Sequence, residues 1–288
     1  MPDIRDVINE TYLRTERTRP TGSRTADRNI QYFAEVFGLE DAARLDERSI
    51  PIVDNLVSWW SLDTASISGA TAKDWWGSNG SYYNHGAMTG LVASSLGKIR
   101  ESLTWGDPGD QLLVSDHSSI QNLWNSGASF ECWLNLTYDA SSDFLVSKGS
   151  WIVYHVGAFP TMVFRIQKYF STTNGVWQVS PGNALYGRWL HLVVTYNAGS
   201  VSNDPVVYLN GVSQHVTETQ TPVGTSVTDV GSDLIIGSDS GGLTPANGLL
   251  DEVRYYGDIL NSVEVTHNFN TVRRMPLGSF YPGEEVAI

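Results

Sequence analysis

Two stretches of the chain restrict its fold more than any other part of the sequence, residues 187–212 and residues 233–260. In each stretch, short runs of alternating apolar and polar residues are separated by Gly, Asn, Asp and Ser. Alternation with a period of two is typical of strands, and these four residue types mark the turns between strands. Asn210-Gly211 is the clearest turn, because a two-residue type I′ hairpin needs positive φ at both positions. The chain is therefore predicted to be an all-β protein.

The same period-two pattern begins near residue 50 and divides the chain into three parts. Residues 51–270 are predicted to form a two-sheet antiparallel sandwich, residues 1–50 a short helical N-terminal arm, and residues 271–288 an extended C-terminal tail. The clearest strands are predicted over residues 56–60, 130–134, 144–146, 151–156, 161–167, 175–179, 190–196, 206–209, 234–236 and 250–256.

The N-terminal arm contains two short amphipathic patterns separated by a polar linker with Pro20 and Gly22. Two short helices cannot bury much surface by themselves. They therefore either clasp the chain's own β domain or form an arm that docks on a partner or on a second copy. The apolar residues that would make these contacts are Ile4, Ile8, Tyr12, Ile30, Phe33 and Phe37.

Composition excludes several classes of function. The net charge is −13, which argues against a general nucleic-acid binder, because phosphate recognition needs a basic surface. Cys132 is the single cysteine, so no intrachain disulfide can form. The first twenty residues lack the apolar segment of a signal peptide, and no apolar run is long enough to span a membrane.

Two motifs carry a resemblance to a known family. The first is G-x-W-x-H-x-x-x-T-Y followed by Y-x-N-G, and the second is I-G followed by G-x-x-D-E-V-R-x-Y and a Leu. They are matched by Gly187, Trp189, His191, Thr195, Tyr196, Tyr208, Asn210 and Gly211, and by Ile236, Gly237, Gly248, Asp251, Glu252, Val253, Arg254, Tyr256 and Leu260. Over residues 52–270 the chain thus resembles the laminin-G-like branch of the concanavalin A-like lectin/glucanase superfamily.

The resemblance implies a jelly roll of two packed sheets and, in some branches, a structural calcium ion. Asp251 matches the position that often helps to hold this ion, and Asp74 is the expected second ligand. The alternative is that Asp251 accepts hydrogen bonds and holds no metal. Related glucanases carry catalytic carboxylates spaced as E-x-D-x-E on one strand, and this chain has no such run. The chain is therefore predicted not to be an enzyme.

An aromatic loop follows Asp74 and is the candidate binding site. Its residues Trp75, Trp76, Tyr82, Tyr83, Asn84 and His85 combine flat rings with hydrogen-bonding groups. Such rings stack on sugars, anchor protein interfaces, or simply pack over a sheet edge. The loop is therefore predicted to contact a glycan or a protein partner, with ordinary packing as the alternative.

The function that best combines these features is that of a non-catalytic structural protein of a virion. The predicted partners are other capsid or tail proteins, further copies of the chain, and a host surface glycan. The motivation is a lectin-like domain with an arm at each end and no export signal. The alternative is a carbohydrate-binding module that is not tied to a virion.

Overall fold

The computed structural model of the chain describes residues 51–76, 83–94, 96–157, 161–181 and 185–271. The predicted arm, with Ile4, Ile8, Tyr12, Ile30, Phe33 and Phe37, and the tail from residue 272 lie outside the described residues. Helices are short in the described part: η2 (Thr64–Ser66), η3 (Ser118–Ile120), α3 (Leu123–Ser126) and α4 (Ser262–Asn270). None of its helices has the length and apolar character needed to cross a membrane.

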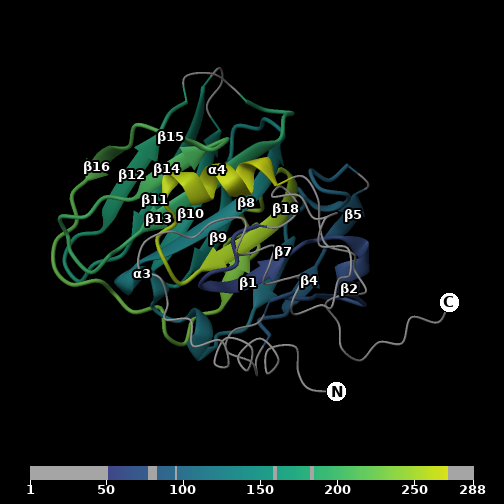
Figure 1. Cartoon of the computed structure of the whole chain (residues 1–288), viewed down its shortest axis with the longest axis horizontal. Coiled ribbons are helices and arrows are strands. Elements are labelled where there is room, and N and C mark those ends of the chain that lie inside the picture. The colour runs from purple at the N-terminus through teal and green to yellow at the C-terminus, as the bar shows by residue number, and fades with distance from the viewer. Residues whose placement is uncertain (1–50, 77–82, 95, 158–160, 182–184, 272–288) are drawn as a thin grey trace, which may run out of the picture.

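Most described residues belong to two antiparallel sheets (Figure 1). The eight-stranded sheet has the order β15 (Val212–Ser213), β14 (Val206–Leu209), β13 (Leu190–Tyr196), β8 (Ala128–Leu136), β18 (Gly248–Tyr256), β6 (Ser102–Trp105) and β5 (Val92–Ser94), with β1 (Leu56–Trp60) also pairing with β18. The ten-stranded sheet has the order β16 (Thr217–Gln220), β12 (Gly175–Val179), β11 (Met162–Lys168), β10 (Trp151–Gly157), β9 (Ser142–Lys148), β17 (Leu234–Ile236), β7 (Gln111–Val114), β4 (Gly86–Thr89), β3 (Thr71–Ala72) and β2 (Ile67–Ser68).

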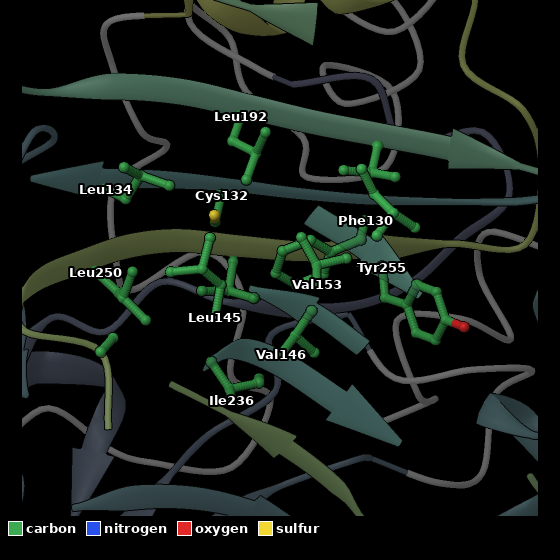
Figure 2. Packing of buried hydrophobic residues seen from close by; sticks show 14 of the residues in the cluster. Phe130, Cys132, Leu134, Leu145, Val146, Val153, Leu192, Ile236, Leu250 and Tyr255 are labelled. Atoms are coloured by element: carbon green, nitrogen blue, oxygen red, sulfur yellow. The ribbon is translucent and has the colours of Figure 1, made fainter. Parts of the chain in front are cut away.

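The main core lies between the two sheets (Figure 2). Phe130, Cys132 and Leu192 contribute to it from the eight-stranded sheet, and Leu145 and Val153 contribute from the ten-stranded sheet. All five side chains are at most 2% exposed. This arrangement confirms the predicted jelly-roll sandwich, since alternate residues of both sheets face one shared apolar layer.

Each of the ten strands predicted from alternation is present. The predicted hairpin is also confirmed, since Asn210 and Gly211 have φ of 51° and 80° and connect β14 to β15. Alternation did not reveal eight other strands of two to four residues (β2 to β7, β15 and β16), which are too short to show a period. Helix α4 was also missed, although Asn261 and Glu264 form a capping box at its start that the sequence contains as N-x-x-E.

Helix α4 covers the outer face of the eight-stranded sheet (Figure 1, yellow). Phe269 on α4 stacks on Trp133 of β8 with centroids 5.6 Å apart. A second apolar cluster, which includes Leu56, Tyr208 and Val265, fills the space between the sheet and its cover. The outer face of this sheet is therefore a second core rather than an open surface.

A buried charge network lies under α4. Arg254 on β18 donates from Nη1 to Glu131 Oε1 at 2.7 Å and from Nη2 to Glu252 Oε2. Glu131 also accepts from His191 Nε2 at 2.9 Å and from Asn268 Nδ2 at 2.7 Å. All five side chains are at most 1% exposed. His191 is therefore a buried member of this network.

A β-bulge brings these groups to one face. The register of β18 against β8 shifts between Asp251 and Arg254, and Glu252 has φ of 54°. The extra residue allows Glu252 and Arg254 to lie on the same side as Glu131, which pairs directly with Arg254. The D-E-V-R motif thus encodes a buried ion-pair network.

The network shifts the pKa values of its carboxyl groups in opposite directions. Burial alone would raise the pKa of Glu131, but the Arg254 guanidinium and the hydrogen bonds from His191 and Asn268 lower it to about 2. Burial raises the pKa of Glu252 to about 7, despite the opposing effect of Arg254. Burial and then the charge of Glu252 raise the pKa of Asp251 well above its usual range. Glu131 is thus the constant counter-ion of Arg254.

We expect Glu131→Gln to lower the free energy of unfolding by about 3–5 kcal/mol, because it removes the main counter-ion of a buried guanidinium. The matched control is Glu218→Gln, a solvent-exposed glutamate on β16, which should change it by less than about 0.5 kcal/mol. Urea unfolding of both variants measures the difference. Equal stability of the two variants would contradict this role of Glu131.

The stability difference between the wild type and Glu131→Gln should depend on pH. The folded pKa of about 2 lies below the ordinary value of 4.5, so this stabilisation is complete above pH 4.5. It is lost as the pH falls through the folded pKa. Chemical unfolding across acidic pH should therefore show the two proteins converging, and a gap that widens towards low pH would contradict the assignment.

Candidate functional site

The predicted binding loop is organised by Asp74. Its Oδ1 accepts from the backbone N–H of Trp59 at 2.9 Å and of Trp76 at 3.0 Å, and its Oδ2 accepts from the N–H of Asn84 at 3.0 Å. The carboxylate is fully buried. Asp74 thus holds both ends of the loop against β1 through backbone hydrogen bonds.

Two of the predicted ligand-contacting residues are buried, which corrects the prediction for them. Trp75 packs against Trp59 and donates from Nε1 to Ser61 Oγ at 2.9 Å. Asn84 donates from Nδ2 to Ser58 Oγ at 2.7 Å and is 1% exposed. The second core beneath the loop accommodates these groups, so they stabilise the loop and cannot present a surface to a glycan.

The other described residues of the loop remain accessible. Trp76 and Tyr83 are half-buried, and His85 is exposed and stacks on Tyr83 with centroids 5.3 Å apart. His85 Nδ1 accepts the backbone N–H of Asp74 at 3.0 Å, and partial burial lowers the pKa of His85. Tyr82 lies outside the described residues. A role for Trp76, Tyr83 and His85 in binding a ligand stays a prediction.

The carboxylates of Asp74 and Asp251 do not fit the predicted calcium ion. Three N–H groups point at Asp74, and Asp251 Oδ2 accepts the N–H of Ile99 at 2.8 Å. Within the part of the chain that the structure describes, no three His, Cys, Asp or Glu side chains lie close enough to hold a metal.

A second accessible surface lies on the outer face of the ten-stranded sheet, over β9 to β12. The inward residues of these strands, such as Val153, Phe164 and Trp177, belong to the main core, so their neighbours in sequence point away from it. We call the outward set the Tyr154–Arg165 face, of which all residues except Ser147 are at least partly exposed: Ser142, Phe144, Ser147, Ile152, Tyr154, Val156, Val163, Arg165, Gln167, Val176 and Gln178.

One row of this face combines aromatic, cationic and amide groups. Tyr154 pairs across the strands with Phe144 on one side and Arg165 on the other, and Arg165 pairs with Gln178. Directly opposed residues have Cβ atoms about 5 Å apart, so the four side chains form a continuous stripe. Tyr154 meets Phe144 edge to face with centroids 5.6 Å apart, which fixes the tyrosine ring.

The sequence signal for this face is the polar half of the alternation. In residues 162–168, MVFRIQK, every second residue is Met, Phe, Ile or Lys, and Arg165 and Gln167 lie between them. The pattern predicts a strand over residues 161–167, but it does not show which polar side chains of neighbouring strands lie side by side. Cross-strand pairs depend on register, which the sequence of one strand does not contain.

We expect Asp74→Asn to lower the free energy of unfolding by about 1–3 kcal/mol, because it replaces a charged acceptor of three N–H groups. Asp107→Asn, at an exposed position, is the matched control and should have little effect. Calcium and a chelator should leave the melting temperature of the wild type unchanged. A calcium-dependent increase that is absent in Asp74→Asn would instead place an ion at Asp74.

Comparison with solved structures shows similarity to several larger proteins. The binding domain of Paraclostridial Mosquitocidal Protein 1 has a TM-score of 0.56 and 17% identity, over 76% of this chain and 52% of that chain. The receptor binding domain of botulinum neurotoxin C/D mosaic serotype has a TM-score of 0.55 and 10% identity, over 76% of this chain and 51% of that chain. Trypanosoma rangeli sialidase in complex with sialic acid has a TM-score of 0.56 and 14% identity, over 77% of this chain and 34% of that chain.

At these identities the similarity concerns the fold alone, and this chain spans about half or less of each of those chains. No curated protein matches the chain. A family model described as the concanavalin A-like lectin/glucanases superfamily matches residues 107–266, which is more than half of the 288 residues. The chain therefore belongs to the concanavalin A-like lectin/glucanases superfamily.

Proposed function

We propose that this chain is a non-catalytic, lectin-like module that binds glycans on the Tyr154–Arg165 face. The observation that carries the proposal is the stripe of Phe144, Tyr154, Arg165 and Gln178 across three strand pairings. An aromatic ring offers a flat apolar surface to a sugar ring, and amide and guanidinium groups donate hydrogen bonds to its oxygens. Such a combination is typical of small-ligand sites.

The amides on this face are available for a ligand. Gln167 and Gln178 are half-buried, and their side chains make no hydrogen bond in the part of the chain that the structure describes. By contrast, Asn84 and Asn268 use their amides within the fold. Polar groups that are held in place by a rigid sheet and remain unpaired lower the entropic cost of recognition.

The fold and the solved structures support the proposal at a coarser level. The superfamily to which the chain belongs is named for lectins as well as for glucanases. One similar structure is a sialidase in complex with sialic acid, and two others are a binding domain and a receptor binding domain of toxins. These roles belong to those proteins, and they favour recognition of a ligand as the role proposed for this chain.

The distribution of carboxyl groups supports the non-catalytic part of the proposal. Glycoside hydrolysis commonly uses two carboxyl groups on either side of the scissile bond. Among the outward residues of β9 to β12 that the structure describes, none is acidic. Glu131 and Glu252 lie together but are sealed under α4 on the other side of the sandwich.

A second candidate for chemistry, the Asp143–His155 pair, is occupied within the fold. His155 Nδ1 lies 3.1 Å from Asp143 Oδ2, and its Nε2 lies 2.8 Å from the hydroxyl of Tyr186. The imidazole is fully buried and both ring nitrogens are engaged. A histidine in this state joins β9, β10 and the segment before β13 and has no nitrogen left for a substrate.

The predicted virion role is not part of this proposal. Besides the lectin-like domain and the missing export signal, it was based on the arms, residues 1–50 and 271–288, of which the structure describes residue 271 alone. Capsid and tail partners and self-assembly through the N-terminal arm therefore stay predictions. A glycan-binding module is compatible with a virion and with other settings.

We expect Tyr154→Ala to weaken glycan binding by about fivefold or more, which corresponds to ~1 kcal/mol, because it removes the stacking ring. Tyr154→Phe keeps the ring and should retain most of the affinity. Val263→Ala, at an exposed position of α4 on the opposite side of the sandwich, should leave binding unchanged. A glycan array followed by calorimetry on the ligands found measures these affinities.

Absence of glycan binding by the full chain would contradict the proposal. Binding that survives Tyr154→Ala but is lost in Trp76→Ala would move the site to the predicted loop, where Tyr83 and His85 stack.

A further inference from the structure

Arg165 differs from the other buried or half-buried cations of the described chain in having no partner. Arg254 binds Glu131 and Glu252, and Lys148 Nζ lies 2.7 Å from Asp116 Oδ1. Arg165 makes no hydrogen bond or ion pair there, and its Nε is a buried donor without an acceptor. An unpaired charged group is costly, and an anionic ligand that accepts from the Nη groups, which are not buried, would offset that cost.

Arg165 cannot avoid this cost by losing its proton. Lys168, its inward neighbour on the same sheet, responds to burial by a pKa lowered to about 8 and donates to Ser150 Oγ and Val227 O. A guanidinium stays protonated at every physiological pH. The charge of Arg165 is therefore permanent and must be balanced by solvent or by a ligand.

The electrostatic environment of Arg165 is unusual for this chain. The whole sequence has 31 acidic and 18 basic residues. Of the eleven outward residues of β9 to β12, none is acidic and Arg165 is the single basic one. Because charges on other surfaces are screened beyond about 8 Å at physiological salt, an anion that reaches this face meets a local positive field.

The position of Arg165 in the stripe defines the shape of its ligand. Tyr154 lies on one side of Arg165 and Gln178 on the other, each directly opposed across a strand pair. A sugar ring stacked on Tyr154 would place a substituent over the guanidinium and hydroxyls near the amide. The planar guanidinium matches a carboxylate, with which it can form two parallel hydrogen bonds.

Because Arg165 is the single cation of this face, it favours a ligand that places one negative charge at the site. Densely sulfated or phosphorylated polymers require clusters of basic residues, whereas this face has one and the chain carries a net charge of −13. A sugar acid carries one carboxylate per ring, which one guanidinium can neutralise.

We infer that the Tyr154–Arg165 face selects glycans that bear a carboxylate, with Arg165 binding the carboxylate and Tyr154 the sugar ring. The inference rests on the proposed function and specifies the ligand class of the same site. Arg165 is the specificity-determining residue, and Gln178 and Gln167 bind neutral parts of the sugar.

The test uses the full chain and pairs of oligosaccharides that differ in one group. One member ends in glucuronic acid and the other in glucose; a second pair ends in N-acetylneuraminic acid and its carboxyl-reduced form. We expect the wild type to bind the acid of at least one pair about tenfold more tightly than the neutral member, a difference of ~1.4 kcal/mol. The preference should weaken as salt is added.

Arg165→Gln should bring the ratio of acid to neutral affinity close to one. Arg165→Lys keeps the charge but loses the bidentate geometry, so it should keep a reduced preference. Arg188→Gln, at an exposed arginine outside the face, should retain the full preference. Melting temperatures near that of the wild type show that each variant is folded.

Different results separate the two proposals. Equal binding of acid and neutral sugars by the wild type, with loss of both in Tyr154→Ala, would overturn the inference and leave the proposed function intact. Retention of the acid preference in Arg165→Gln would also overturn it. Failure of every sugar to bind would overturn both, as would binding of a glutamate-rich peptide in place of any sugar.

Discussion

The ion pairs of Arg254 with Glu131 and Glu252 are the interaction on which the arrangement of this protein depends. A guanidinium and two carboxyl groups on the outer face of the eight-stranded sheet are stable only if that face is closed and each group is hydrogen-bonded. Helix α4 provides the cover, and Asn268 joins it to both Glu131 and the backbone of Ile52. The outer face of the eight-stranded sheet is thus covered by α4 and packs internally. The surfaces that can bind a ligand are the outer face of the ten-stranded sheet and the loop beside β1.

The two sides use charge in opposite ways. Under α4, His191, Asn268 and Arg254 all converge on Glu131, so the charges are balanced within the fold. On the Tyr154–Arg165 face the sheet holds two aromatic rings, two amides and a guanidinium, and no residue of the face balances the charge of that guanidinium. A rigid scaffold with unpaired donors is suited to binding, because the groups are positioned before the ligand arrives.

Much of the fold could be predicted from the sequence, because alternation and turn residues are local signals. The strands of five or more residues and the Asn210-Gly211 hairpin follow from them. The candidate site could not be found in the same way. The aromatic residues after Asp74 were predicted to contact a ligand, but Trp75 fits the second core, whose existence depends on α4 and on the bulge at Glu252. Likewise, Tyr154 and Arg165 are eleven residues apart and become neighbours only through the register of β10 and β11.

The proposed glycan site lies over β9 to β12. The most direct measurement is a two-dimensional NMR titration of the isotope-labelled full chain with the glucuronic-acid-terminated oligosaccharide. We expect the largest chemical-shift changes at the backbone amides around Tyr154, Arg165 and Gln178 and at the Arg165 side chain. Changes concentrated instead around Trp76 and His85, or over α4, would contradict this proposal.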